Sequence, residues 1–394
     1  MITETIYEHL KDIYNSKVDP LVSPAIEIDP SFTVSRVIHD ITNNDVYDVF
    51  CMDGGTVLTT NVRALLAGKD IADMKISPFL SPIRFLTRND FIQKAANIIA
   101  HYRVRAVPVV ENNKIIGCVT AKSILEILSK KDNKWIKANL ILTPNPITIK
   151  SNEPIGTARK LMLSKRIDHL PVINKNAVKQ VLTSFHILQT INPLESLGRR
   201  SLGMTKVGKF SANIGNIGST RIPRCTPDDN LNTIIRIMLD TDTTCCLVSL
   251  WDKLQGIITY NDILSLLAAK IESEIPLYVV GMPEEQKNVD LIISKFSNTL
   301  KKIRNVYSEI QEARVTIKKQ RTGSNKRKEG MYEISIMIIT PHYTPFIFKE
   351  SGWDLGKVFE TLSKKMLRTL SKRAKRRFKP SIRKIETPGL IESI

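Results

Sequence analysis

Two groups of residue types in this sequence are spaced for binding chemistry. The first is Gly256, Thr259 and Asp262, where a hydroxyl ends an apolar strand and a carboxylate follows in the first turn of the next helix. Such a pair can hold the hydroxyls of a sugar. Thr120 and Thr183 stand at corresponding strand ends. A threonine there can also simply cap the following helix, and that structural interpretation stays open beside the binding one.

The second group is cationic and lies near the C-terminus. Residues 275–394 hold 25 Lys and Arg against 12 Asp and Glu, a net charge of +13 out of +19 for the whole chain. No acidic residue lies between Glu360 and Glu386. Charge of one sign gathered on one segment raises self-repulsion, so it indicates a polyanionic partner. A solvated helix face is the alternative.

Other chemistry is poorly represented. The five cysteines show no CxxC spacing and the six histidines form no HxxxH pair, so we expect buried thiols in a reducing cytoplasm and no metal site. Lys209 follows a glycine-rich run that lacks the complete phosphate-loop pattern. With no catalytic triad or paired carboxylates, we expect a protein that is not an enzyme.

Length and composition are those of a globular chain. At 394 residues, with 42% hydrophobic and 25% charged residues, two to four domains are expected. The N-terminus lacks a signal-peptide pattern, and no apolar run approaches the ~20 residues needed to span a bilayer. We therefore expect a cytoplasmic protein with no membrane partner.

An internal repeat dominates the first 273 residues. One pattern occurs four times: an extended segment, an amphipathic helix, two short strands and a second helix. Its strand-end threonines are Thr60, Thr120, Thr183 and Thr259. Repetition at this period predicts βαββα units that bury their sheets by pairing. We expect an N-terminal helix in 1–20, a first pair in 21–137, and a second pair in 138–273 with an insertion in 193–218.

These units resemble the CBS domain family, in which two tandem repeats make one Bateman module. The resemblance is carried by Val107-Pro108-Val109-Val110, Leu170-Pro171-Val172-Ile173 and the stretch from Gly256 to Asp262. It implies a cleft that takes an adenine nucleotide (AMP, ADP or ATP) as a regulatory ligand, with no cofactor required. Only the fourth repeat carries the complete G-h-h-T-x-x-D signature, because Arg63, Ser123 and His186 replace the aspartate elsewhere.

From residue 274 the period changes. The predicted order is strand, helix, three strands, helix, which makes an α+β domain with two helices on one face of a four-stranded sheet. Asp354 is placed to cap the last helix, whose buried stripe includes Leu355, Phe359 and Leu362. The overall expectation is therefore two CBS pairs of mixed α/β type followed by a basic β-α-β-β-β-α domain.

That order and the basic last helix resemble the bacterial hibernation-promoting factor (ribosome-associated inhibitor A) family. The resemblance implies a ribosome partner, chiefly rRNA of the small subunit with its ribosomal proteins. The rRNA-binding candidates on the last helix are Lys364, Lys365, Arg368, Lys372, Arg373, Lys375, Arg376 and Arg377. Weaker candidates on the hairpin are Arg321, Lys326, Arg327 and Lys328.

Both resemblances together look like archaeal CBS-domain ribosome dormancy factors. Our hypothesis is a non-enzymatic factor that occupies the small-subunit mRNA and decoding region and represses translation, tuned by nucleotide in a CBS cleft. The alternative is a ligand-sensing CBS-domain regulator that binds free DNA or RNA. Self-association through the CBS pairs fits both hypotheses.

Overall fold

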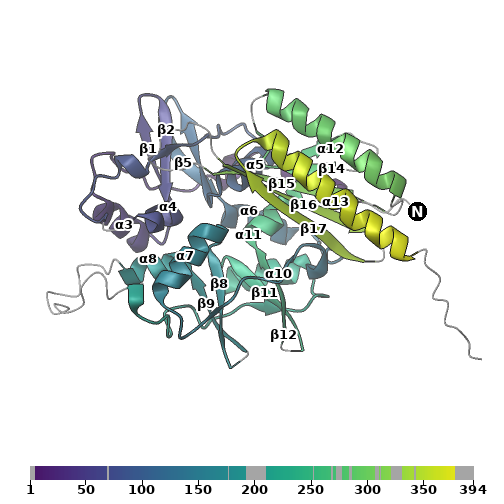
Figure 1. The fold of residues 1–394 in the computed structure, drawn as a ribbon. Helices are drawn as coiled ribbons and strands as arrows, with labels where there is room; N and C mark the ends of the chain where they lie inside the picture. Colours follow the sequence, from purple (N-terminus) through teal and green to yellow (C-terminus); the bar gives the residue numbers. More distant parts are fainter. Residues whose placement is uncertain are drawn as a thin grey trace, which may run out of the picture.

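The structure is a computed structural model that describes residues 5–377, apart from 69–70, 176, 192–209, 252, 268, 272–276, 284–285, 307–309, 311, 321–330 and 341–342. Four hairpin units form one part and a two-helix α+β domain forms the other (Figure 1). The hairpin candidates Arg321, Lys326, Arg327 and Lys328 lie outside the described residues. So do the side chains of Lys372, Arg373, Lys375, Arg376 and Arg377.

The N-terminal segment forms two single-turn helices, α1 (Ile6–His9) and α2 (Lys11–Tyr14). Thr5 and Glu8 form a reciprocal capping box that starts α1. Leu10 and Ile13 are buried in the same core as the second and fourth units. Tyr7 stacks on Tyr278 of the C-terminal domain with ring centroids 5.1 Å apart, so this segment joins both parts.

The four units share one order of elements. The first is α3 (Val34–Asn43), β1 (Asp48–Asp53), β2 (Thr56–Asn61) and α4 (Val62–Ala67). The second is α5 (Ile92–Tyr102), β4 (Ala106–Glu111), β5 (Lys114–Thr120) and α6 (Ala121–Lys130). The third is α7 (Ile155–Lys165), β8 (His169–Asn174), β9 (Ala177–Thr183) and α8 (Ser184–Ile191). The fourth is α10 (Leu231–Asp240), β11 (Cys245–Leu250), β12 (Lys253–Thr259) and α11 (Tyr260–Leu264).

Short connecting strands complete these units. β3 (Ser81–Pro82) pairs with β2, and β6 (Thr143–Pro144) pairs with β12. β7 (Ile149–Lys150) and β10 (Arg224–Cys225) run parallel to β8 and β11. The end of the predicted insertion is not merely a loop, because Ile214 is fully buried in the third unit's core and the Gly218 amide donates to Gln180 Oε1.

Local sequence explains the units. Thr33 and Asn230 cap α3 and α10 with side-chain oxygens, and buried apolar residues recur along one face of each helix. The β4–β5 hairpin turns through Asn112 and Asn113, which both have positive φ, a conformation that asparagine tolerates. In each unit, one face of the sheet and one face of the helices are apolar. The unit must therefore pack against other units to bury these faces.

The partners differ for sheets and helices. The sheets of the first two units meet through Phe50, Ala106 and Cys118. Those of the last two meet through a cluster that includes Val181 and Cys245. The two sheet-paired halves then join through helices: α6 packs on α10 and α11, and α4 packs on α7 and α8. The centre of this arrangement is where all four units meet.

The C-terminal domain has the predicted order, with one correction. Its elements are β14 (Leu277–Val280), α12 (Gln286–Val306), β15 (Glu312–Gln320), β16 (Met331–Thr340), β17 (Tyr343–Gly352) and α13 (Leu355–Arg377). The sheet has five strands instead of four, because β13 (Ala269–Ile271) pairs antiparallel with β14. This segment was predicted to belong to the repeats, and its backbone instead satisfies the open edge of β14.

Alternation along the strands gives this sheet two faces. Val315, Ile317 and Ile336 point into a core shared with α12 and α13, where Phe296 and Phe359 meet edge to face. The opposite face lies against the hairpin units, with α5 beside β14 and β15 (Figure 1). The helical layer is therefore the outer layer of the domain. Among the described residues, no helix combines the length and apolar character that crossing a membrane would require.

Candidate functional site

One residue from each unit occupies an equivalent position at the centre. These residues are Tyr47, Arg105, Asp168 and Thr244, each just ahead of its unit's first strand. In every unit the carbonyl of this residue accepts a hydrogen bond from the first residue of the second helix. The repeated backbone thus delivers four different side chains to one place.

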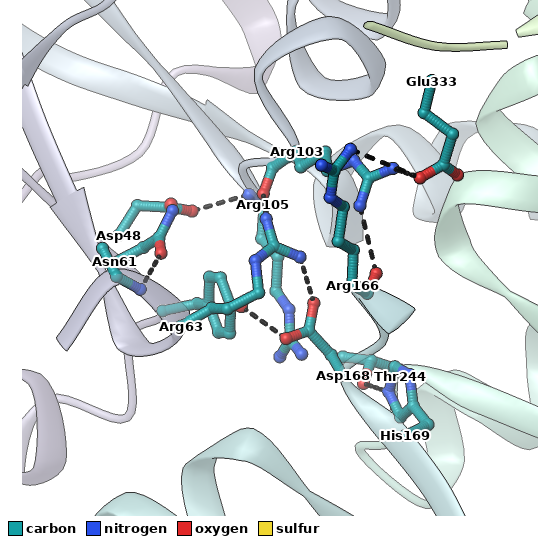
Figure 2. A network of polar contacts seen from close by, with 12 residues as sticks. Asp48, Asn61, Arg63, Arg103, Arg105, Arg166, Asp168, His169, Thr244 and Glu333 are labelled. Atoms are coloured by element: carbon teal, nitrogen blue, oxygen red, sulfur yellow. Dashed lines mark hydrogen bonds and ion pairs between the residues drawn. The ribbon is translucent and has the colours of Figure 1, made fainter. Parts of the chain in front are cut away.

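These side chains form a buried polar network (Figure 2). Asp168 accepts from the Tyr47 hydroxyl at 2.8 Å and pairs with Arg63 at 3.1 Å. Burial alone would raise the pKa of Asp168, but the charges of Arg63 and Arg105 outweigh burial and lower it to about 2. Arg63, which replaces the signature aspartate of the first repeat, therefore serves as the counter-ion of Asp168.

Arg105 is a second buried cation of this network, and it has no ion-pair partner among the described residues. Its guanidinium lies 3.9 Å from the ring centroid of Tyr47, a cation–π contact. Its Nε and one Nη are buried, and neither has a hydrogen-bond partner among the described residues. A buried guanidinium without acceptors is costly, so its environment is complete only when an acceptor is supplied.

Arg105 lines a cavity of about 540 Å³. The wall includes apolar groups such as Pro24, Ile26 and Phe50, and also Thr120 and Thr183. Both threonines precede helices that point away from the cavity: Thr120 caps α6, and Thr183 shares a short contact with His186 Nδ1 at 2.8 Å. Hydroxyls and helix starts favour oxygen-rich or anionic ligand groups.

Two further titratable groups face this cavity. Burial raises the pKa of Asp48 to about 7, although its carboxylate accepts from the amides of Arg105 and Ala106. Burial lowers the pKa of His169 to about 4, so this imidazole is neutral and hydrogen-bonds Thr244 at 2.6 Å. The buried part of the cavity wall therefore combines the neutral His169 with the cation Arg105, while Lys122 and Arg221 add cationic groups to the lining.

The fourth unit's signature lies elsewhere. Asp262 accepts from the Thr259 amide and hydroxyl at 2.7 Å each, and from Thr143 at 3.1 Å. A Cβ on Gly256 would lie 2.9 Å from the Thr143 carbonyl, so this glycine allows β6 to pack closely. None of Gly256, Thr259 and Asp262 lines the 540 Å³ cavity.

What surrounds Asp262 is a space of only about 50 Å³. Its other wall is the C-terminal sheet, through Arg314, Thr316 and Lys349. The structure therefore brings Thr120 and Thr183 together at the large cavity and separates them from the most complete signature. The sequence analysis did not identify Tyr47, Arg105 and Asp168 as site residues. An alignment of the four repeats at the residue before each first strand would have shown that these positions are equivalent.

The network continues into the C-terminal domain. Arg103, two residues from Arg105, pairs with Glu333 of β16 at 2.6 Å and donates to the Arg166 carbonyl. Arg166 approaches the same carboxylate at 3.8 Å. Both arginines end a helix in the left-handed conformation, at equivalent places in the second and third units. Figure 2 shows them converging on Glu333.

Several exposed cations of the C-terminal domain lie on its helical layer. Lys364, Lys365 and Arg368 of α13 are exposed, and Lys364 pairs with Glu360 one turn earlier. Lys365 approaches Glu350 at 3.7 Å. Among the described residues, no group of three His, Cys, Asp or Glu side chains is placed to hold a metal ion.

Comparison with known proteins identifies the repeats. The CBS domain family model matches residues 71–130, 138–192 and 214–269, which are the second, third and fourth units. The chain therefore contains CBS domains over these three ranges. The first unit lies before the matched residues, and its elements α3, β1, β2 and α4 repeat the order of the other three.

Two relatives are similar to this chain over about three fifths of its length. The chain is 29% identical over 245 residues to protein MJ1404 of Methanocaldococcus jannaschii, which covers 60% of this chain and 57% of that protein. It is 24% identical over 277 residues to the SNF1-related protein kinase regulatory subunit gamma-1 of Arabidopsis thaliana, covering 62% and 63%. The chain thus spans little more than half the length of these relatives.

A solved structure shows the same fold. Protein MJ1225 of Methanocaldococcus jannaschii covers 64% of this chain and 100% of its own, with a TM-score of 0.57 and 16% identity. None of these matches supports the predicted resemblance to the hibernation-promoting factor family, which stays a prediction.

Proposed function

We propose that this CBS-domain protein is a non-enzymatic sensor that binds adenine nucleotide in its central cavity. The observation that carries the proposal is Arg105, which lines a cavity of about 540 Å³ and has two buried guanidinium nitrogens without an acceptor among the described residues. A volume of this size is typical of small-molecule sites. A phosphate group would supply the missing acceptors.

The cavity walls suit the rest of a nucleotide. Apolar side chains such as Pro24, Ile26 and Phe50 can cover a base, and the hydroxyls of Thr120 and Thr183 can bind ribose or phosphate. The starts of α6 and α8 add their dipoles beside these threonines. A regulatory role is also supported by the similarity to a kinase regulatory subunit.

Calorimetry with AMP, ADP and ATP tests this proposal. We expect the wild-type chain to bind at least one of them, and Arg105→Gln to weaken binding by about tenfold or more, since a hydrogen bond to a charged group contributes about 1.5–3 kcal/mol. Arg236→Gln, on the exposed face of α10, is the matched control and should bind like the wild type. A wild-type chain that binds none of the three nucleotides would contradict the proposal.

A second function concerns the basic domain, and we propose that it binds structured RNA, with the small ribosomal subunit as the target. It is supported by Lys364, Lys365 and Arg368, which stand exposed on α13, and by the buried opposite face of the sheet. Among the described residues, these cations of the helical layer are then available to a polyanion. Phosphate contacts of this kind weaken steeply with salt.

Co-sedimentation with ribosomal subunits tests the second function. We expect the wild-type chain to travel with small subunits at low salt, and Arg373→Glu, Arg376→Glu and Arg377→Glu together to abolish this. The control reverses three exposed lysines of the repeats, Lys114, Lys160 and Lys253. Equal binding to any free duplex at the same salt would favour the alternative, a ligand-sensing nucleic-acid regulator.

A further inference from the structure

The four units turn their hairpins in the same way. Each hairpin (β1–β2, β4–β5, β8–β9 and β11–β12) connects its strands through two residues, and the first of these has φ between 46° and 53°. The residues at this position are Gly54, Asn112, Lys175 and Trp251. A tight hairpin turn of this kind requires positive φ, which glycine and asparagine adopt at little cost.

Trp251 and Lys175 are poorly suited to this turn. A bulky side chain such as tryptophan is rare in the left-handed region, because the conformation is strained. Trp251 is also 87% exposed, so its indole gains almost no stabilisation from burial in return. Both residues belong to the second pair of units, whereas the first pair has Gly54 and Asn112 at the same place. A strained and exposed aromatic side chain that the fold does not require indicates a contact outside the chain.

The β8–β9 and β11–β12 hairpins lie side by side. Arg224 of β10 donates to the Val178 carbonyl of β9 at 2.8 Å, and Val178 and Leu254 pack against one apolar cluster between the two sheets. Figure 1 shows both hairpins at the edge of the repeats that faces away from α12 and α13. The two unusual turns therefore belong to one surface, separate from the basic helical layer.

Four exposed cations lie on these hairpins and on the strands beside them. They are Lys150, Lys175, Lys179 and Arg224, and none of them forms an ion pair among the described residues. Lys150 of β7 stands opposite Ile173 near the end of β8. We call these four cations together with Trp251 the hairpin edge.

The charge of the hairpin edge is not a general property of the repeat. The β8–β9 hairpin contains two lysines and no acidic residue, and in β11–β12 the charge of Lys253 offsets that of Asp252. In the first pair, β1–β2 contains two acids and no cation, and β4–β5 contains one of each. The same fold is therefore built without these cations, and their presence here indicates a polyanionic partner.

We propose that the hairpin edge binds single-stranded nucleic acid, with a base stacked on Trp251 and phosphates at the surrounding cations. An aromatic ring beside a row of cations is the general means by which proteins hold single strands without reading their sequence. A lipid surface fits less well, because an interfacial membrane site needs several apolar side chains, and Trp251 is the one large exposed apolar residue on the described part of these two hairpins. The hairpin edge is separate from Arg105 and from α13, so this inference depends on neither proposed function.

Fluorescence anisotropy with a labelled oligouridylate of about a dozen nucleotides tests the inference. The parent is the full chain with Arg373→Glu, Arg376→Glu and Arg377→Glu, so that the basic last helix contributes little. We expect Trp251→Asn to weaken binding about fivefold or more, and Trp251→Tyr to stay within about twofold of the parent because a ring remains.

The salt dependence separates stacking from charge. Lys175→Asn should lower the slope of log K against log salt by about 0.7, the single-strand value for one phosphate, while Trp251→Asn leaves the slope unchanged. Lys114→Asn, which removes the same charge from the β4–β5 hairpin, is the matched control and should change neither affinity nor slope. Because asparagine suits the turn, Trp251→Asn and Lys175→Asn should both unfold at a higher temperature than the parent, so weaker binding cannot result from misfolding.

Three results would overturn the inference. The parent could fail to bind oligouridylate, Trp251→Asn could bind it as tightly as the parent, or Lys175→Asn and Lys114→Asn could lower the salt slope equally. A Trp251→Asn variant that loses binding to phosphatidylserine vesicles but keeps its affinity for oligouridylate would assign the hairpin edge to a membrane instead. None of these results bears on nucleotide binding at Arg105 or on co-sedimentation with small ribosomal subunits.

Discussion

At the scale of single residues, the chemistry of this protein depends on how buried charges are balanced. Asp168 sits between Arg63 and Arg105, which both favour its ionised form. Its pKa falls from 3.8 to about 2, which corresponds to roughly 2–3 kcal/mol of stability. The folded state binds the proton less tightly than the unfolded chain, so this stability is complete above pH 4 and is lost as pH falls toward 2.

Asp168→Asn should therefore destabilise the protein most at neutral pH. It leaves Arg63 buried without its ion-pair partner, for which a loss of about 3–5 kcal/mol is expected. Urea unfolding at pH 7 and at pH 3 measures this, and the difference between variant and wild type should shrink at the lower pH. Asp240→Asn, an exposed change on α10, is the control. An unchanged unfolding midpoint at pH 7 would contradict the assigned ion pair.

At the scale of elements, the same strand–helix junction lies in different surroundings in different repeats. Thr120 and Thr259 both form capping boxes with the third residue of the following helix, Ser123 and Asp262. The junction of β5 with α6 opens on the large cavity, whereas the junction of β12 with α11 is covered by the C-terminal sheet. The repeat with the complete signature is therefore not the one whose strand–helix junction opens on the cavity. How accessible a junction is depends on which other elements pack against it.

Arg103 and Arg166 show a second consequence of repetition. Each follows its helix in the left-handed conformation, φ 56° and 55°, and equivalent places in the first and fourth repeats hold Asp45 and Asp242 at φ 49°. The backbone turn is common, and the side chain decides the partner. Arginines at two of the four turns face Glu333, while Asp242 pairs with Lys122 near the surface.

At the scale of the whole molecule, the C-terminal domain is docked on the repeats by the Glu333 carboxylate. Burial would raise the pKa of Glu333, but Arg103 and Lys318 outweigh burial and lower it. The Arg103 side chain is only 7% exposed, so it depends on this partner. Arg103 contacts the C-terminal domain and Arg105 lines the cavity, and the two residues are only two positions apart. The domain interface and the cavity are therefore connected through one short stretch of backbone.

Glu333→Gln should loosen this docking. Two arginines would lose their anionic partner in a buried interface, for which we expect a loss of about 3 kcal/mol or more. Hydrogen exchange should show faster exchange in β16 and at the end of α5. Glu350→Gln makes the same chemical change on β17 in an exposed pair with Lys365, where about 0–1 kcal/mol is expected. Equal effects of the two substitutions would contradict the role of Glu333.

The repeats, their element order and the basic last helix could all be predicted from the amino-acid sequence. Apolar periodicity, turn residues such as Asn112 and Asn113, and caps such as Asp354 act within about ten residues, so local reasoning captures them. Local reasoning did not predict the fifth strand, β13, because a strand of three residues is too short to show an alternating pattern. Its position depends on pairing with β14.

The position of the cavity and the residues that line it, in contrast, depend on how the repeats pack together. Tyr47, Arg105 and Asp168 come from three repeats and are far apart in sequence, so no local pattern marks them as neighbours. The tertiary structure also placed the C-terminal sheet over Asp262 and left Thr120 and Thr183 at the open cavity. Burial and pairing of charge are properties of the packed molecule, because they depend on what surrounds a side chain in space.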